Sequence, residues 1–101
     1  MTKPSQRACP VVRAASLIGD EWVLLILREL FKRSHKFDEL QKATGAATNI
    51  LTNRLKRMVD GGIVVKLPYQ ERPPRFKYRL TEAGLGLLPL ALEMMRYGED
   101  W

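Results

Sequence analysis

The sequence predicts a mainly α-helical domain that also contains a small β-hairpin. Apolar side chains at Leu51, Leu55, Met58 and Val59 follow the i, i+4, i+7, i+8 spacing of a helix with one packed face. Residues 76–80 instead alternate apolar and basic side chains, as a half-buried strand does. The length of 101 residues and the ordinary hydrophobic content of 46% fit one globular domain.

Two helices are expected near the N-terminus. Pro10 suits the first turn of a helix over about residues 11–18, and the chain then breaks at a glycine. Asp20 is a suitable N-cap for a second helix over about residues 21–31. That helix is apolar nearly all round, so we expect it to be the buried central helix of the domain.

A third and a fourth helix follow a basic connection at residues 32–36. The third is short, has Phe37 and Leu40 facing inward, and ends at Gly45, where glycine can adopt a positive φ. The fourth is expected over about residues 48–60 and is stopped by two glycines. Its polar side chains lie opposite the packed face.

A two-stranded hairpin and a last helix complete the chain. Residues 63–65 begin the β-rich segment, and Pro73 with Pro74 belongs at the hairpin tip because proline cannot donate ladder hydrogen bonds. Thr81 is the expected N-cap of the last helix. Pro89 predicts a kink in that helix, or a second helix that begins near it.

The C-terminal segment carries more apolar side chains than one face of a terminal helix needs. We therefore expect a partner subunit to cover them, most simply in a two-fold homodimer. The residues concerned are Leu85, Leu87, Leu88, Leu90, Leu92, Met94, Met95, Tyr97 and Trp101.

The charge of the chain is unevenly distributed. The net charge is +6 and the pI is near 9.8, which favours a polyanionic partner. Residues 64–81 hold five basic and one acidic side chain, whereas residues 82–101 hold one basic and four acidic ones. The hairpin is thus the most positive segment.

A helix with a polar face followed by a basic hairpin predicts a winged helix-turn-helix that binds double-stranded DNA. Asn49 and Asn53 are candidates to contact adenine, and Thr52 to contact a thymine methyl or a phosphate. Thr48 begins the same polar face. The candidate phosphate contacts are Lys36, Lys56, Arg57, Arg72, Arg75 and Lys77. Phe76 and Tyr78 are expected to pack in the core. The alternative is an ordinary solvent-exposed helix face.

These segments together resemble the HxlR-type family of bacterial winged helix-turn-helix transcriptional regulators. The resemblance spans nearly all of residues 1–101. It rests on residues 9–11 (CPV), 17–22 (LIGDEW), 24–30 (LLILREL), 37–40 (FDEL), 50–55 (ILTNRL), 61–64 (GGIV), 73–84 (PPRFKYRLTEAG) and 87–90 (LLPL).

The resemblance implies a homodimer built from the N- and C-terminal helices, with two recognition helices in successive major grooves. The recognition helix would span about residues 48–60, the wing about 63–80 and the dimerisation helix about 82–99. The family usually has Gly-Ile-Ser where this chain has Gly45-Ala46-Ala47, so Thr48 is the candidate N-cap in place of the missing serine.

Cys9 has two interpretations, which the sequence leaves open. Arg7 and Arg13 would favour its thiolate, and some members of the resembled family sense oxidants or electrophiles with a cysteine here. Alternatively, Cys9 is a small apolar group buried at the dimer contact, and no second cysteine is present to resolve a sulfenic acid.

No enzymatic or metal chemistry is expected. One cysteine and one histidine cannot supply four zinc ligands, and His35 is expected to be an ordinary surface residue of a loop. No catalytic triad, phosphate-binding glycine loop or paired carboxylates occur, so we expect no cofactor and no enzyme.

The expected compartment is the cytoplasm. The first seven residues lack a signal-peptide core, and the longest apolar run, residues 22–27, is too short to cross a bilayer.

The favoured function is a homodimeric, sequence-specific regulator that binds a pseudo-palindromic DNA site. The alternatives are a winged-helix protein-interaction module and a non-specific nucleoid-type DNA-binding protein. The sequence does not specify the operator, repression or activation, or a small effector.

Overall fold

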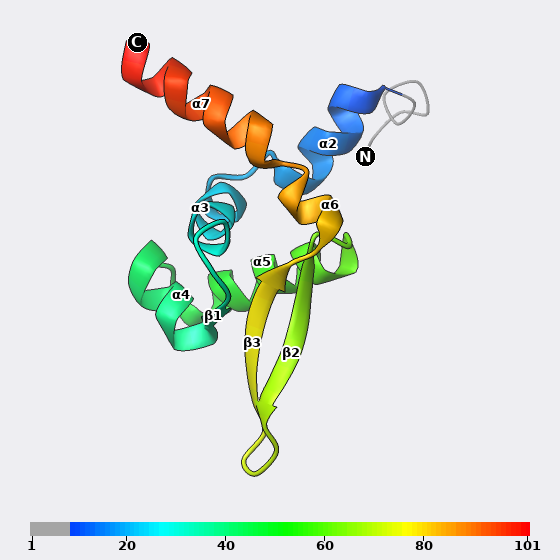
Figure 1. The fold of residues 1–101 in the computed structure, drawn as a ribbon, viewed down its shortest axis with the longest axis vertical. Helices are drawn as coiled ribbons and strands as arrows, with labels where there is room; N and C mark the ends of the chain where they lie inside the picture. The colour runs from blue at the N-terminus through cyan, green and yellow to red at the C-terminus, as the bar shows by residue number, and fades with distance from the viewer. Residues whose placement is uncertain (1–8) are drawn as a thin grey trace.

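The computed structural model describes residues 9–101 (Figure 1). Arg7 and the segment examined for a signal peptide lie outside these residues. The helices and strands, in chain order, are α2 (Pro10–Ile18), α3 (Glu21–Leu30), β1 (His35–Lys36), α4 (Phe37–Thr44), α5 (Thr48–Asp60), β2 (Val64–Gln70), β3 (Arg75–Leu80), α6 (Glu82–Leu85) and α7 (Leu88–Asp100). The predicted mainly α-helical fold with a β-hairpin is confirmed.

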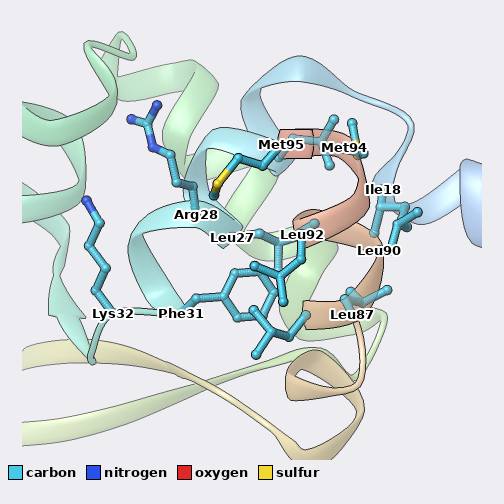
Figure 2. A pocket seen from close by; sticks show the side chains of 13 residues that line it. Ile18, Leu27, Arg28, Phe31, Lys32, Leu87, Leu90, Leu92, Met94 and Met95 are labelled. Atoms are coloured by element: carbon cyan, nitrogen blue, oxygen red, sulfur yellow. The ribbon is translucent and has the colours of Figure 1, made fainter. Parts of the chain in front are cut away.

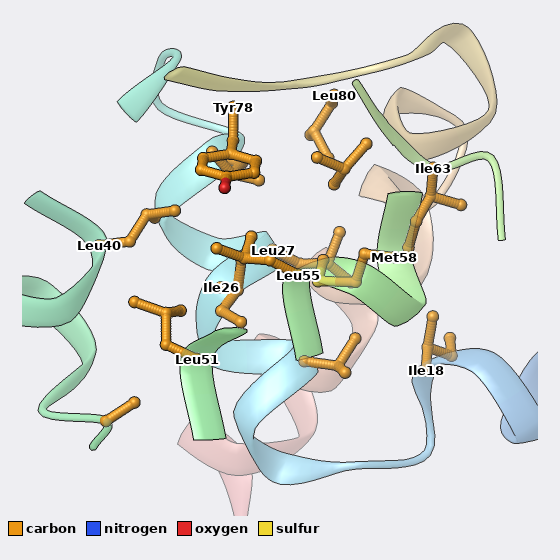
Figure 3. Packing of buried hydrophobic residues seen from close by; sticks show 14 residues of the cluster. Ile18, Ile26, Leu27, Leu40, Leu51, Leu55, Met58, Ile63, Tyr78 and Leu80 are labelled. Atoms are coloured by element: carbon orange, nitrogen blue, oxygen red, sulfur yellow. The ribbon is translucent and has the colours of Figure 1, made fainter. Parts of the chain in front are cut away.

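The core forms around α3, as its uniformly apolar sequence predicted. Val23, Ile26 and Leu27 of this helix are buried, and α3 packs against α4, α5 and β3. The packed face of α5 meets this helix through Leu51, Leu55 and Met58, while Val59 is only partly buried at the margin (Figure 3). Tyr78 and Leu80 of β3 close the same cluster from the sheet side.

The sheet has three strands in the order β1–β3–β2, so the expected two-stranded hairpin is incomplete. β3 pairs antiparallel with β2 over most of its length, and β1 adds His35 opposite Tyr78 on the other edge. A two-residue strand shows no alternation in the sequence, which explains why β1 was not predicted.

The expectation that His35 is a surface residue is wrong. Its pairing with β3 places His35 in the interior, with only 6% of its surface exposed. The ring Nδ1 lies 2.8 Å from the carbonyl oxygen of Arg33, and a carbonyl can only accept, so Nδ1 carries the proton. His35 is therefore a hydrogen-bonded core residue.

Helix ends follow the capping chemistry of the sequence. Asp20 accepts a hydrogen bond from the Val23 backbone N–H at 3.1 Å and caps α3, and Thr81 caps α6 through the Gly84 N–H at 3.1 Å. Gly45 ends α4 with a φ of 74°, which favours glycine. The last helix divides into α6 and α7, with Pro89 in the first turn of α7.

Helix α7 extends away from the body of the domain (Figure 1). No residue of this helix is buried. Its exposed apolar side chains are Leu88, Leu90, Leu92, Met94, Met95 and Tyr97, and the neighbouring Trp101 is 89% exposed. Side chains of this kind seldom remain in water over so large an area, so α7 is a candidate contact surface.

Replacing Leu51 by alanine tests the central packing of α5 on α3. The Leu51 side chain has no exposed surface, so Leu51→Ala should lower the free energy of unfolding by about 3 kcal/mol, within the range of buried Leu→Ala changes. Asn49→Ala, on the exposed side of the same helix, should change it by less than about 0.5 kcal/mol. Urea unfolding followed by circular dichroism measures both, and equal losses would contradict the assigned orientation of α5.

Candidate nucleic-acid interface

Helices α4 and α5 form a helix-turn-helix with a turn at residues 45–47. The positive φ at Gly45 reverses the chain direction, and the buried Ala46 fixes the turn to the core. Because one face of α5 is occupied by the core, the opposite face is set by the helical period. This exposed face presents Thr48, Asn49, Thr52, Asn53 and Lys56.

Thr48 is not the N-cap of α5, contrary to the expectation from the sequence. Ala47 holds that position and provides no side-chain hydrogen bond, while Thr48 is the first helical residue. Its hydroxyl oxygen accepts a hydrogen bond from Gln41 Nε2 on α4 at 2.9 Å. Gln41 therefore fixes Thr48 from the first helix of the motif, a contact between elements that no local pattern predicts.

Asn53 is held by its neighbour Arg54. The Arg54 guanidinium donates to Asn53 Oδ1 at 3.0 Å and, through Nε, to Asp20 Oδ2 at 3.1 Å. The hydrogen bond from Arg54 lowers the pKa of the Asp20 carboxyl below its ordinary value. By contrast, the side chains of Asn49 and Thr52 make no hydrogen bond within residues 9–101.

Lys56 and Arg57 project in different directions. Lys56 is exposed on the polar face and pairs with Asp60 one turn later, at 2.9 Å, which raises the pKa of the lysine. Arg57 instead donates to the Ser16 carbonyl of α2 at 3.3 Å. Of the two predicted phosphate contacts, Lys56 lies beside the base-contact candidates and Arg57 lies on the flank that faces α2.

The wing consists of β2 and β3 and the turn between them, and it projects from the body (Figure 1). Arg72 is exposed in the turn and Arg75 at the start of β3, while Lys77 is half-buried. The predicted core packing is confirmed for Tyr78, which is buried. It is wrong for Phe76, which lies outside the core cluster, half-buried beneath the Lys66 ammonium group at 4.3 Å from the ring centroid, because the wing projects beyond the core at this position. Burial raises the pKa of Tyr78.

A groove of about 520 Å³ separates α5 from the sheet. Thr52, Lys56 and Asp60 line its helix side, while Lys66 and Tyr78 line its sheet side. A duplex with α5 in its major groove and the wing in the next minor groove would have to pass one sugar–phosphate strand between these two elements. The groove therefore lies where the protein would contact the sugar–phosphate backbone of such a duplex.

Lys66 is the residue of this surface that sequence analysis did not select. It also lines a neighbouring depression with Lys36 and Arg75, which the structure thereby brings to one side of the wing. Lys36 lies over the Tyr69 ring, 4.8 Å from its centroid. The positive charge of residues 64–81 was the available signal, but alternation alone did not tell which side of the hairpin faces α5.

Cys9 precedes α2 as its N-cap residue and is partly exposed. Groups of three or more metal-binding side chains are absent from the described part of the chain. In residues 9–101, no helix has the length and apolar character that a bilayer crossing demands.

An apolar cleft of about 520 Å³ lies between α3 and α7 (Figure 2). Phe31 and Leu27 point into it from α3, and Leu92 from α7. Arg28 and Lys32 stand at its border, where both pair with the buried Glu29 carboxylate, at 2.9 and 3.2 Å. These two cations therefore share one carboxylate within the subunit.

Fold and surface together define a winged helix-turn-helix domain. Residues 17–101 match the family model described as HxlR-like helix-turn-helix. The chain belongs to the HxlR-like helix-turn-helix family, as its sequence motifs indicated. Members matched below are transcriptional regulators and not enzymes, in line with the prediction of no enzymatic activity.

Comparisons with individual proteins agree with the match to the family model. The HTH-type transcriptional regulator Rv3095 of Mycobacterium tuberculosis is 38% identical over 91 residues, covering 90% of this chain and 58% of the relative. The chain thus spans little more than half the length of that relative. The crystal structure of PA1607 superposes with a TM-score of 0.88 at 41% identity, covering 99% of this chain and 70% of that one. The redox regulator HypR in its oxidized form superposes with a TM-score of 0.83 at 30% identity, and the match covers 92% of this chain and 97% of that one.

Proposed function

We propose that this chain is a sequence-specific, double-stranded DNA-binding transcriptional regulator that acts as a homodimer in the cytoplasm. The observation that carries the proposal is the groove between α5 and the sheet, where the polar face of the helix meets Lys66 of the basic wing. An ordinary solvent-exposed helix would not share a groove with a basic hairpin.

Base readout and backbone contact are divided between the two elements. Asn49, Thr52 and Asn53 lie on the exposed face of α5 and would enter the major groove. The cations beside them would bind phosphates, which supply affinity without sequence information. These phosphate contacts are Lys36, Lys56, Lys66, Arg72, Arg75 and Lys77, with Thr48 and Arg57 at the margins.

Dimerisation would follow from the exposed apolar side chains of α7. The cleft between α3 and α7 continues this apolar surface, so a second copy could bury both together. Two α5 helices related by a two-fold axis would contact half-sites about 34 Å apart, one turn of the duplex. A pseudo-palindromic site is the corresponding DNA sequence.

Selection of bound duplexes from a random pool tests the function directly. A regulator should enrich a pseudo-palindrome with half-sites about one helical turn apart. A nucleoid-type protein would bind all duplexes alike, and a protein-interaction module would show little salt-dependent binding to any duplex. Either of the last two results would reject the proposal.

Arg75→Ala should weaken binding by a similar factor on all sequences. Removing one phosphate contact should also reduce the slope of log K against log salt by about one unit. Lys66→Ala should behave likewise, because Lys66 lines the same depression. Arg96→Gln on α7, far from the wing, is the matched control and should leave the slope unchanged. Fluorescence anisotropy at several salt concentrations measures all four proteins, and an unchanged slope for Arg75→Ala would remove that residue from the interface.

Leu92→Glu should dissociate the dimer. Leu92 is 52% exposed in the isolated subunit and lines the α3–α7 cleft, so a charge there would be buried without a partner on association. Analytical ultracentrifugation should show a monomer that still melts cooperatively and binds DNA at least tenfold more weakly. Leu92→Met should remain dimeric, and a dimeric Leu92→Glu protein would exclude this face as the interface.

A redox response through Cys9 is a second proposed property. Its support is the partial exposure of the thiol at the start of α2 and the similarity to HypR, a protein described as a redox regulator. With one cysteine per chain, oxidation would join two subunits or attach a small thiol.

Treatment with diamide should release the wild-type protein from DNA, and reduction should restore binding. Cys9→Ser should bind DNA normally and resist diamide, because it lacks the thiol that reacts. Anisotropy titrations with and without oxidant provide the measurement. Equal sensitivity of both proteins would show that Cys9 is not the sensor.

A further inference from the structure

We infer that Arg54 is a positioning residue for base readout, and that it turns the amide oxygen of Asn53 toward itself and the amino group toward DNA. The inference rests on the proposed function, since it concerns how α5 selects its bases. The inference changes the base that Asn53 is expected to prefer, because an asparagine whose amide can rotate would be expected to contact adenine.

Arg54 is fixed from two sides. Its Nε and one terminal nitrogen both lie 3.1 Å from Asp20 Oδ2, and only 20% of each side chain is exposed. Asp20 in turn accepts from the Val23 backbone N–H through its other oxygen, so the acid is anchored to the N-terminus of α3. One hydrogen bond and an ion-pair contact to the same carboxylate oxygen thus hold the guanidinium in place.

The remaining nitrogen of Arg54 donates to Asn53 Oδ1 at 3.0 Å. A guanidinium has only donors, so the carboxamide of Asn53 must present its oxygen to Arg54 and its amino group away from it. Asn53 is exposed on the polar face of α5, and the amino group is the part left for a ligand.

An outward amino group favours acceptor atoms on the base edges. In the major groove these are guanine O6 and N7, thymine O4 and adenine N7. The two-bond recognition of adenine also needs the amide oxygen as acceptor for N6–H, so adenine gains least from an outward amino group alone. Asn49, one turn earlier, has no such hydrogen bond within residues 9–101 and can turn its amide to either edge. The two asparagines therefore differ: Asn49 reads adenine, and Asn53 reads guanine or thymine.

The test compares selected duplexes for the wild type, Arg54→Lys and the control Arg96→Lys. Loss of preference in Asn53→Ala identifies the base position that Asn53 contacts. The wild type should favour guanine or thymine there, and Arg54→Lys should raise the relative binding of adenine about tenfold by freeing the amide. Arg96→Lys, on α7 with its ion pair to Glu93, should keep the wild-type preference.

Asn53→Asp provides a second variant if Arg54→Lys does not fold. The aspartate keeps a bond to Arg54 but offers only acceptors, so preference should move from guanine or thymine to cytosine, whose amino group donates. Preference unchanged in Arg54→Lys or Asn53→Asp would overturn the inference while leaving the regulator intact. A wild type that selects no sequence would instead overturn the proposed function itself.

Discussion

The packing of α5 on α3 is the constraint on which the rest of the structure depends. Leu51, Leu55 and Met58 bury one side of α5 in the core, and the helical period then decides which side chains face outward. Tyr78 joins the same core from β3, so the wing and α5 rest on one support. The groove between them is consequently set by core packing and not by the loops that connect the two elements.

A second set of contacts fixes the back of α5 to the corner between α2 and α3. Arg54 binds Asp20, Arg57 binds a carbonyl of α2, and Gly61 lies so close to Leu17 that a β-carbon would stand 2.6 Å from its methyl group. Residues 54, 57 and 61 are three and four residues apart, so they lie on one face of the helix. Asp20 both caps α3 and holds Arg54, so the start of the central helix and the orientation of a base-contact candidate depend on one carboxylate.

Most of the fold could be predicted because its signals are local. Periodicity identified α3, α5 and β3, and capping chemistry identified Asp20 and Thr81. The errors arose where a distant segment decides the outcome. His35 is buried because β3 pairs with it, and Thr48 is bonded to Gln41 across the turn. For the site, the sequence supplied the exposed residues of α5 and the cations of the wing, but only tertiary packing turns Arg57 toward α2 and Lys66 toward the groove.

The groove beside the wing and the cleft beside α7 share no lining residue and differ in chemistry. The groove is lined by two lysines, a threonine and Asp60 among apolar side chains, whereas the cleft beside α7 is apolar and has at its border two cations that pair with Glu29. Lys56 pairs with Asp60 inside the groove, whereas Lys66 has no ion pair among residues 9–101 and is the cation available to a polyanion. The apolar cleft suits another apolar surface. Because the two surfaces share no residue, one subunit of the proposed homodimer could hold DNA and a second subunit at once. Joining two subunits would add the phosphate and base contacts of two α5 helices, so that modest affinity per subunit would become strong binding for the pair.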